Sequence, residues 1–430
     1  MVYRKILTIL MAGLVLGGME ITHHIQAQSI PENLPIVAWV GANQLWVSDA
    51  NGNVRVRVGE DVQAAALSPN RTQIAYHTGE NLSVLAVDSG DVVASLSADI
   101  FLANPAIPDS APRFSTPYWV SDTTLWFNTI DFYTSAYGYE NRHDIQQWNI
   151  AENKPTEIAP PGAGGVLLPS PDHSKIAVYR PGHYQDFSDP AVIEILDVAT
   201  GEIIGDPITF PTVATGSEVD WFPSITWSQS SDAIGFSIPD PDLLYFAADE
   251  FPTTQICVMA IRGDTDCQWP SIAFPAQPIF EPDLSAWAAL QPDSSGWALV
   301  IGMASDESLE HLRVLPRDVL FPRMANHILV EPIDWLDEAH FLVRAIFDDP
   351  PQTQILSVDV TSGTYQAWPD ETATSVITNL QPLGDSLYAI AYGDFSSTQV
   401  MIYDTVAQIA TPLRMPTTTE NVGWIAFALR

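Results

Sequence analysis

The chain has 430 residues, with 17 Lys and Arg against 52 Asp and Glu, so its formal net charge at pH 7 is -35. Apolar residues make up 46% of the chain, which excludes a disordered acidic segment, because such segments lack the apolar residues for a core. The negative charge argues against a nucleic-acid binder, which needs a basic surface to displace counterions. It also disfavours anionic membranes and polyanionic substrates.

The first 27 residues have the pattern of an export signal. Arg4 and Lys5 precede an apolar run from Ile6 to Gly18, and a polar stretch then ends at Ala27. This order is typical of a cleavable signal peptide, and the run is shorter than the roughly 20 residues that span a bilayer. We expect a signal peptide at 1–27, a short linker at 28–33, and a secreted or periplasmic mature chain without a membrane span. The alternative is an uncleaved N-terminal anchor.

The two cysteines of the chain flank a short segment that is typical of a hairpin turn. Cys257 and Cys267 stand on either side of residues 261–266, which include Gly263 and Asp264. Two strands leaving such a turn place their thiols within reach of a disulfide, and an oxidising compartment would preserve the bond. The alternative is a pair of free thiols. Zinc binding is disfavoured, because a structural zinc site takes four ligands.

A repeated pattern organises the rest of the chain. An apolar segment, a turn and an apolar strand with small residues follow one another, as in residues 64–67, Pro69-Asn70 and Ile74-Ala75-Tyr76. Copies are anchored at residues 69, 120, 171, 229, 282, 336 and 382. Proline and Asp or Asn favour the turns, and most copies continue with a third strand and a second turn. Four antiparallel strands per roughly 50 residues indicate one propeller blade.

The two ends of the chain complete this pattern. Residues 36–58 supply three strands and lack the strand before their first turn, while residues 422–427, which include Trp424, supply a spare strand. We therefore predict an all-β fold, a single β-propeller at 34–430 with eight four-stranded blades. Pairing of the C-terminal strand with the N-terminal blade would close the ring. Seven blades would result if two weak units merged. A pair of β-sandwiches does not explain the spare strand.

The turns also carry a family resemblance. Ser68-Pro69-Asn70 with Ile74-Ala75-Tyr76, and Ser170-Pro171-Asp172 with Ile176-Ala177-Val178, resemble the WD40-like β-propeller repeats of the TolB and PD40 type. The copies around Pro69, Pro171 and Pro282 keep the proline, but the glycine that this family usually has after the Asp is missing. The family includes periplasmic interaction proteins and non-catalytic domains of peptidases. The resemblance therefore implies the fold and a tendency to bind partners, not an activity.

The candidate binding surface consists of three long connections between the second and third strands of blades 3, 4 and 5, at 131–141, 181–189 and 239–250. Because they are the same connection in adjacent blades, we expect them to share one rim. Their aromatic residues offer flat apolar area, and their carboxylates orient a ligand. The alternative is that the loops pack on one another and cover the face. The expected ligand-binding residues are Tyr133, Tyr137, Tyr139, His183, Tyr184, Asp186, Phe187, Asp240, Asp242, Tyr245 and Phe246.

These observations predict an exported, non-catalytic, monomeric propeller that binds a protein, peptide or carbohydrate and needs no cofactor or metal. Ca²⁺ held by Asp131, His143, Asp189 and the rim carboxylates is the weaker alternative, because no Asp-rich loop has a fixed register of ligands. The alternative function is a glycosidase or polysaccharide lyase that uses carboxylates on the rim of blades 3–5. Whether the chain is an enzyme stays open.

Two motifs resemble catalytic ones but fall at turns of the repeat. Gly384-Asp385-Ser386-Leu387 matches the signature of GDSL esterases, and Asp337 and His340 have the spacing of their Asp-x-x-His. Both precede a second strand, and their order along the chain is reversed. We therefore expect no catalysis at either motif. The Gly-x-Ser-x-Gly and His-Glu-x-x-His motifs do not occur in the sequence.

Overall fold

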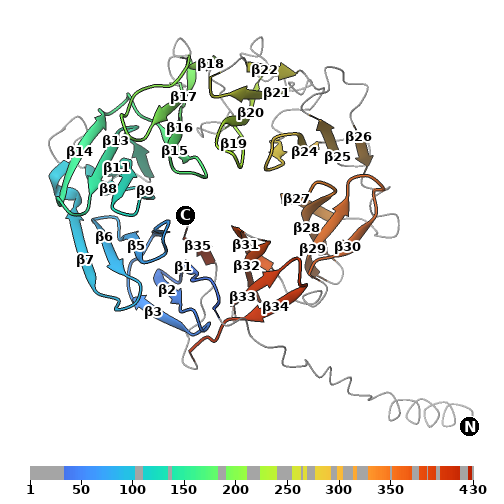
Figure 1. Cartoon of the computed structure of the whole chain (residues 1–430), viewed down its shortest axis with the longest axis horizontal. Helices are drawn as coiled ribbons and strands as arrows, with labels where there is room; N and C mark the ends of the chain where they lie inside the picture. Colours follow the sequence, from blue (N-terminus) through green and yellow to red (C-terminus); the bar gives the residue numbers. More distant parts are fainter. Residues whose placement is uncertain are drawn as a thin grey trace, which may run out of the picture.

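The computed structural model is a closed wheel of β-sheets (Figure 1). Eight four-stranded antiparallel sheets surround a central axis, and one three-stranded sheet is added to them. The prediction of an eight-bladed all-β propeller is therefore confirmed. The structure describes residues 33–101, 110–133, 138–182, 190–210, 223–239, 254–262, 265–268, 277–291, 298–303, 313–316, 328–348, 351–369, 377–384, 386–393, 398–416 and 425–428.

In each of blades 1 to 4, the first strand named lies nearest the axis and the last lies on the outer side. Blade 1 has β35 (Ile425–Phe427), β1 (Ala38–Gly41), β2 (Gln44–Ser48) and β3 (Val54–Val58). Blade 2 has β4 (Ala64–Leu67), β5 (Gln73–His77), β6 (Asn81–Ala86) and β7 (Val92–Ser97). Blade 3 has β9 (Tyr118–Ser121), β10 (Thr124–Phe127), β13 (Ile145–Asn149) and β14 (Lys154–Ala159). Blade 4 has β15 (Val166–Pro169), β16 (Lys175–Arg180), β17 (Ala191–Asp197) and β18 (Ile208–Phe210).

Blades 5 to 8 have the same order of strands. Blade 5 has β19 (Ile225–Trp227), β20 (Ala233–Pro239), β21 (Thr254–Ala260) and β22 (Thr265–Gln268). Blade 6 has β23 (Ile279–Phe280), β24 (Ala286–Gln291), β25 (Ala298–Met303) and β26 (Arg313–Pro316). Blade 7 has β27 (Ile328–Asp337), β28 (His340–Asp348), β29 (Pro351–Asp359) and β30 (Tyr365–Ala367). Blade 8 has β31 (Ile377–Gly384), β32 (Leu387–Tyr392), β33 (Gln399–Asp404) and β34 (Ile409–Pro412).

The two ends of the chain meet in blade 1, as the sequence predicts. β35 pairs antiparallel with β1, with Phe427 opposite Trp39 and Ile425 opposite Gly41. β35 takes the innermost position of that blade (Figure 1). The Asn379 side chain of blade 8 donates a 2.8 Å hydrogen bond to the carbonyl of Ile425. The closing strand is therefore held from both neighbouring strands. Trp424 lies outside the described residues.

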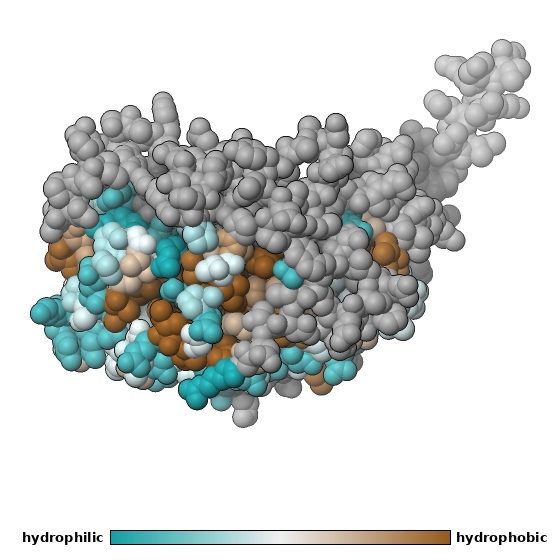
Figure 2. All heavy atoms as spheres, turned by 90° about the horizontal axis from the view of Figure 1, so that it is seen from above, coloured by the Kyte–Doolittle hydropathy of each residue, from teal (hydrophilic) through white to brown (hydrophobic). Residues whose placement is uncertain are grey.

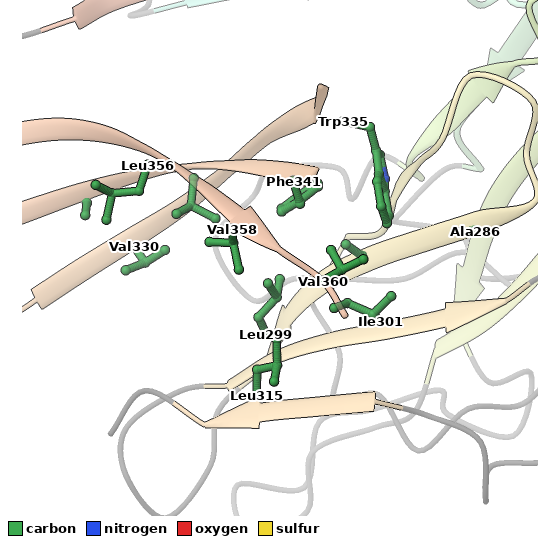
Figure 3. Packing of buried hydrophobic residues seen from close by; sticks show 13 residues of the cluster. Ala286, Leu299, Ile301, Leu315, Val330, Trp335, Phe341, Leu356, Val358 and Val360 are labelled. Atoms are coloured by element: carbon green, nitrogen blue, oxygen red, sulfur yellow. The ribbon is translucent and has the colours of Figure 1, made fainter. Parts of the chain in front are cut away.

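The core of the wheel lies between facing sheets of neighbouring blades. Figure 3 shows this packing between blades 6 and 7, where Leu299 and Ile301 face Val358 and Val360. The strands supply β-branched and aromatic residues that fill this space, each worth about 1.5–3 kcal/mol when fully buried. On the outer side that carries β18 and β22, described apolar and hydrophilic residues are interspersed (Figure 2).

Three tryptophans at one repeat position link blades in pairs. The indole nitrogens donate to carbonyls on the first strand of the preceding blade: Trp119 to Ala66 at 2.9 Å, Trp227 to Leu168 at 2.8 Å and Trp335 to Ile279 at 2.9 Å. Each link satisfies a polar group whose burial without a partner would be costly. The tryptophans therefore fix the spacing of blades 2 and 3, 4 and 5, and 6 and 7.

The seam between blades 7 and 8 contains a carboxyl group. Asp334 of β27 accepts the backbone N–H of Trp335 at 2.8 Å, and burial raises the pKa of Asp334 to about 6. Burial, and after it the charges of Asp334 and Asp337, raises the pKa of Tyr388 on β32 to about 12. An ionised Asp334 therefore disfavours the native seam relative to a neutral one.

Candidate binding face

The order of strands divides the connections of the wheel between two faces. In an antiparallel blade, the connections between strands one and two and between strands three and four leave at the same end. The connections between strands two and three, and from strand four to the next blade, leave at the opposite end. We call the first surface the turn face and the second the loop face.

The turn face is held together by residues that replace the expected glycine. In five of these turns the residue after the Asn, Asp or Ser has a positive φ, near 60°, although it is not glycine; these residues are Arg71, His173, Ser231, Leu284 and Ser386. This conformation costs about 1–2 kcal/mol per residue for a side chain with a Cβ. Most of these side chains compensate for that cost by contacts within or between blades.

The contacts of the left-handed residues are specific. Arg71 donates to the carbonyl of Leu383 in blade 8 at 3.2 Å, and the His173 ring lies 2.9 Å from the carbonyl of Trp119 in blade 3. The hydroxyl of Ser231 accepts the backbone N–H of Asp172 at 3.1 Å. Leu284 is buried in the core of blade 6. A glycine would lose each of these links, which explains its absence.

A turn carboxylate likewise serves the backbone. Asp172 accepts hydrogen bonds from Ser170 at 2.7 Å and from the backbone and side chain of Ser174 at 2.9 and 2.8 Å. Burial raises the pKa of Asp172, but these hydrogen bonds outweigh that effect and lower it to about 2. The carboxylate is thus committed to the turn.

The two GDSL-like motifs also lie on the turn face. The His340 ring lies 2.8 Å from a carboxylate oxygen of Asp337 in the turn between β27 and β28. Ser386 occupies the left-handed position of the next blade's turn, and its carbonyl accepts the backbone N–H of Thr405 at 2.9 Å. Both motifs therefore have a turn role, as the repeat predicts. Asp385 lies outside the described residues.

The loop face has three enlarged connections in consecutive blades. The connections between the second and third strands run over 128–144, 181–190 and 240–253 in blades 3, 4 and 5. In the other blades they are the shorter segments 42–43, 78–80, 292–297, 349–350 and 393–398. The enlarged connections therefore belong to the adjacent blades that the sequence indicates.

Most of the predicted rim residues lie outside the described residues. Tyr133 ends β11 (Thr129–Tyr133), and Tyr139 lies in β12 (Gly138–Asn141). Those outside the described residues are Tyr137, His183, Tyr184, Asp186, Phe187, Asp240, Asp242, Tyr245 and Phe246. The rim as a ligand site therefore stays a prediction.

The expectation of a loop at 131–141 is wrong for its described residues, which form a hairpin. β11 pairs antiparallel with β12, with Phe132 opposite Tyr139 and Tyr133 opposite Gly138. On its other edge β11 pairs with β8 (Ser110–Phe114), which belongs to the connection between blades 2 and 3. The β-branched and aromatic residues of β11 favour a strand, and β8 supplies the partner it needs. We call β8, β11 and β12 the insertion sheet.

The base of the insertion sheet is embedded in the core. Phe114, at the end of β8, is fully buried, and its ring packs edge-on against Phe127 at 5.4 Å and Phe101 at 6.0 Å between ring centres. Phe101 ends the 3-10 turn η1 (Ala98–Phe101). The aromatic cluster therefore anchors the sheet to blades 2 and 3.

A buried polar network holds the root of the hairpin. Asp144 is buried, and its two carboxylate oxygens accept the backbone N–H and the hydroxyl of Thr129, each at 2.7 Å. Gln146 donates to the same carboxylate at 3.1 Å. The Asn128 side chain donates to the carbonyls of Asp144 and, at 2.9 Å, Gly165. Because every bond ties strand ends together, the hairpin leaves blade 3 in a fixed direction.

The same network reaches blade 4 by a close approach of two backbones. A Cβ at Gly164 would lie 2.7 Å from the carbonyl oxygen of His143, so glycine is required there. Arg180 of blade 4 donates to the carbonyl of Ala163 at 2.8 Å and forms an ion pair with Glu194 at 3.3 Å. The roots of the first two enlarged connections are thus fixed to each other.

The sequence interpretation did not identify Asn128, Asp144 and Gln146. Their signal is a set of polar residues directly at the ends of two apolar strands. The same pattern is typical of ordinary loops, so it indicates a buried network only when the partner strand is known.

The remaining candidate features among the described residues are metal sites, free cysteines and membrane-spanning helices. Within the described ranges, no group of three or more His, Cys, Asp or Glu side chains could hold a metal ion. Cys257 is buried and lies opposite Cys267 in the ladder of β21 and β22, and the described part of the chain contains no free cysteine. In that same part, no helix is long and apolar enough to cross a membrane.

Several solved β-structures are similar to this chain at low sequence identity. A crystal structure of the eukaryotic initiation factor matches with a TM-score of 0.50 and 12% identity, over 87% of this chain and 83% of that one. The C-terminal WD40 domain of Sif2 matches with a TM-score of 0.47 and 13% identity, over 84% and 88%. The β-propeller domain of the Trilobed protease from Pyrococcus furiosus matches with a TM-score of 0.46 and 10% identity, over 84% and 96%.

The strand order of the eight blades, together with the match at a TM-score of 0.50, shows the fold class and no narrower family. The chain spans less than half the length of the whole peptidases that it also matches. No protein-family model matches the chain, and no curated protein matches it. The β-propeller class is confirmed, whereas the TolB and PD40 subtype stays a prediction.

Proposed function

We propose that this chain is an exported, non-catalytic interaction propeller that binds a protein, a peptide or a carbohydrate on its loop face at blades 3, 4 and 5. The contrast between the two faces carries the proposal. On the turn face, the left-handed side chains and carboxylates are engaged in links within and between blades. On the loop face, three consecutive connections are enlarged, and the first starts from the buried Asp144 network.

The physical reason is preorganisation. A binding surface loses less conformational entropy when its supporting elements are already fixed. The root of the insertion sheet is fixed by hydrogen bonds of 2.7 Å and by the Phe114 cluster. The tyrosines of the three connections then supply the contact area, as expected for an interface rich in aromatic residues.

The test is a glycan and peptide array with the mature protein, followed by capture of the partner that it identifies. Replacing Tyr137, Tyr184 and Tyr245 by Ala should lower binding at least tenfold. The matched control replaces the exposed Ser89, Ser362 and Ser386 of the turn face by Ala, which should leave binding unchanged. Equal binding by both variants would refute the proposal that the rim of blades 3, 4 and 5 binds the partner. Release of cleaved glycan from the array would refute the non-catalytic assignment.

We also propose that the mature chain starts after Ala27 and carries a disulfide between Cys257 and Cys267. The opposed register of the two residues supports the bond, because Cα atoms of paired strands lie about 4.5–5.5 Å apart, within the range for a disulfide. The measurement is peptide mapping of the exported protein without reduction. A peptide pair that separates only after reduction is expected. Free thiols, or an N-terminus at Met1, would contradict the respective proposal.

A further inference from the structure

The outer side of the wheel presents one edge strand for each of its eight blades. An unpaired edge can add a strand from another chain, and proteins commonly prevent this with charged residues, proline or very short edge strands. Seven of the eight outer strands that the structure describes have such a feature. β3 and β22 contain charged residues, β14 and β26 contain a charged residue and a proline, β34 contains a proline, and β18 and β30 have 3 residues each.

β7 of blade 2 differs from the other described outer strands. It has 6 residues, Val-Val-Ala-Ser-Leu-Ser, with neither charge nor proline. Its inner edge pairs with β6, where Leu96 lies opposite Leu82, and no described strand pairs with its outer edge. Figure 1 places β7 at the outer left of the wheel. Among the described outer strands, β7 alone has no charge, no proline and more than 3 residues, and its one protective feature is a β-bulge.

Apolar side chains gather at this edge. Val92 and Val93 are 54% and 52% exposed, and Ile100 in η1 is 50% exposed. The pairing shifts from Val84 opposite Ala94 to Leu85 opposite Val92, so Val93 is the extra residue of a β-bulge. Bulges redirect side chains and are frequent next to functional sites. In β7 the bulge leaves two adjacent valines exposed on an edge strand.

Carboxylates flank the strand at both ends. Asp88 and Asp91 precede β7, Asp99 follows it, and all three residues are exposed. In an antiparallel pair of two copies of β7, Asp91 of one copy would approach Asp99 of the other, and each chain carries a net charge of -35. Like charges at these positions disfavour self-pairing. The same carboxylates favour a strand with basic residues at its ends.

We propose that β7 accepts an extended segment of a partner protein as a fifth strand of blade 2, with an uncharged β-branched centre and basic residues at both ends. Backbone hydrogen bonds to the open edge supply affinity, and side chains of the added strand contact Val92 and Val93. Asp91 and Asp99 select the basic ends. This site is on the outer side of the wheel and does not depend on the loop-face proposal.

The probe is a fluorescein-labelled peptide, Lys-Lys-Thr-Val-Thr-Val-Thr-Lys-Lys, added to the purified full chain. Hydrogen exchange of the β7 amides should slow at least tenfold when the peptide is bound, because the added strand takes up the open edge. A peptide with Glu in place of every Lys should bind at least tenfold more weakly by fluorescence anisotropy. Unchanged exchange at β7 with about 1 mM basic peptide, the weak end of specific binding, overturns the proposal.

Two variants distinguish this edge from general attraction to an acidic protein. Val93→Lys places a positive charge on the edge and should lower the affinity for the basic peptide at least fivefold. Val406→Lys, at a residue that is 81% exposed in a turn of blade 8, adds the same charge elsewhere and should leave the affinity within twofold. Equal losses in the two variants would show nonspecific attraction. Concentration-dependent dimers that protect β7 without peptide would show that a second copy occupies the edge, which also overturns the proposal.

Discussion

The carboxyl group of Asp334 in the seam between blades 7 and 8 leads to a prediction about stability and pH. Burial raises its pKa from 3.8 to about 6. The folded chain therefore holds a proton on Asp334 at pH values where the unfolded chain has lost it. Stability falls as the pH rises through the window from about 4 to 6, because folding must then either bind a proton or accept a buried charge.

The size of the effect follows from that difference in pKa. Each factor of ten in proton affinity corresponds to about 1.4 kcal/mol, so ionisation of Asp334 destabilises the fold by about 3 kcal/mol above pH 7. About half of this is already present at pH 5. Asp334→Asn removes the ionisation and keeps an oxygen that can accept the N–H of Trp335. We expect its advantage in stability over the wild type to grow by about 1.4 kcal/mol between pH 5.0 and 7.5.

The assay is urea unfolding of both proteins at pH 5.0, 6.0, 6.8 and 7.5, followed by tryptophan fluorescence. Asp206→Asn is the matched control, because it removes the charge of an exposed aspartate in blade 4. Its difference from the wild type should stay constant over this range. If the free energies of unfolding of Asp334→Asn and the wild type change in parallel with pH, Asp334 does not titrate in the seam. The electrostatic reasoning would then be refuted.

Five further substitutions, in three tests, examine other parts of the wheel by equilibrium unfolding. Trp335→Phe should lower the free energy of unfolding by about 1 kcal/mol more than Trp287→Phe does. The reason is that the Trp335 indole donates to Ile279, whereas the Trp287 nitrogen has no partner among the described residues. Equal losses of stability would contradict the interblade link. Leu284→Gly should destabilise by about 1–2 kcal/mol, whereas Ser386→Gly should be neutral or up to about 1 kcal/mol stabilising, since Leu284 is buried and Ser386 is exposed at the same turn position. The reverse order would contradict the role given to the left-handed side chains. Asp144→Ala should lower the free energy of unfolding by about 3 kcal/mol, because Thr129 and Gln146 lose their acceptor. It should also speed up hydrogen exchange of the β11 and β12 amides. Unchanged exchange would show that the network does not hold the hairpin.

The blades could be predicted from the sequence because their signals are local. Pro69, Pro171 and Pro282 each mark a turn between the first and second strands, and the carboxylate or amide after them bonds the backbone two residues on. The closing strand was also accessible, because the N-terminal blade lacks one strand and the C-terminus has one to spare. Neither inference needs knowledge of which residues meet across the fold.

The insertion sheet could not be predicted in the same way. β8 and β11 belong to different connections, and neither follows the repeat, so nothing local indicates that they pair. Asp144 and Asn128 are polar residues at strand ends, and only their burial against Thr129 and Gly165 distinguishes them from ordinary loop residues. The edge of β7 stands out only by contrast with the other outer strands, which requires the order of strands in every blade.

The patchiness of the repeat has a structural cause as well. Blades 2, 4, 6 and 8 carry proline in or beside the first turn, whereas blades 3, 5 and 7 carry tryptophan within the first strand. The tryptophans of blades 3, 5 and 7 each bond the blade before them, so the unit that repeats is a pair of blades. In the pair of blades 8 and 1, Phe427 of β35 takes the place of this tryptophan. It lies opposite Trp39, and its side chain has no N–H to donate. Asn379 of blade 8 supplies the bond instead, to the carbonyl of Ile425. Single blades therefore resemble their neighbours weakly because each type needs the other to complete its hydrogen bonds.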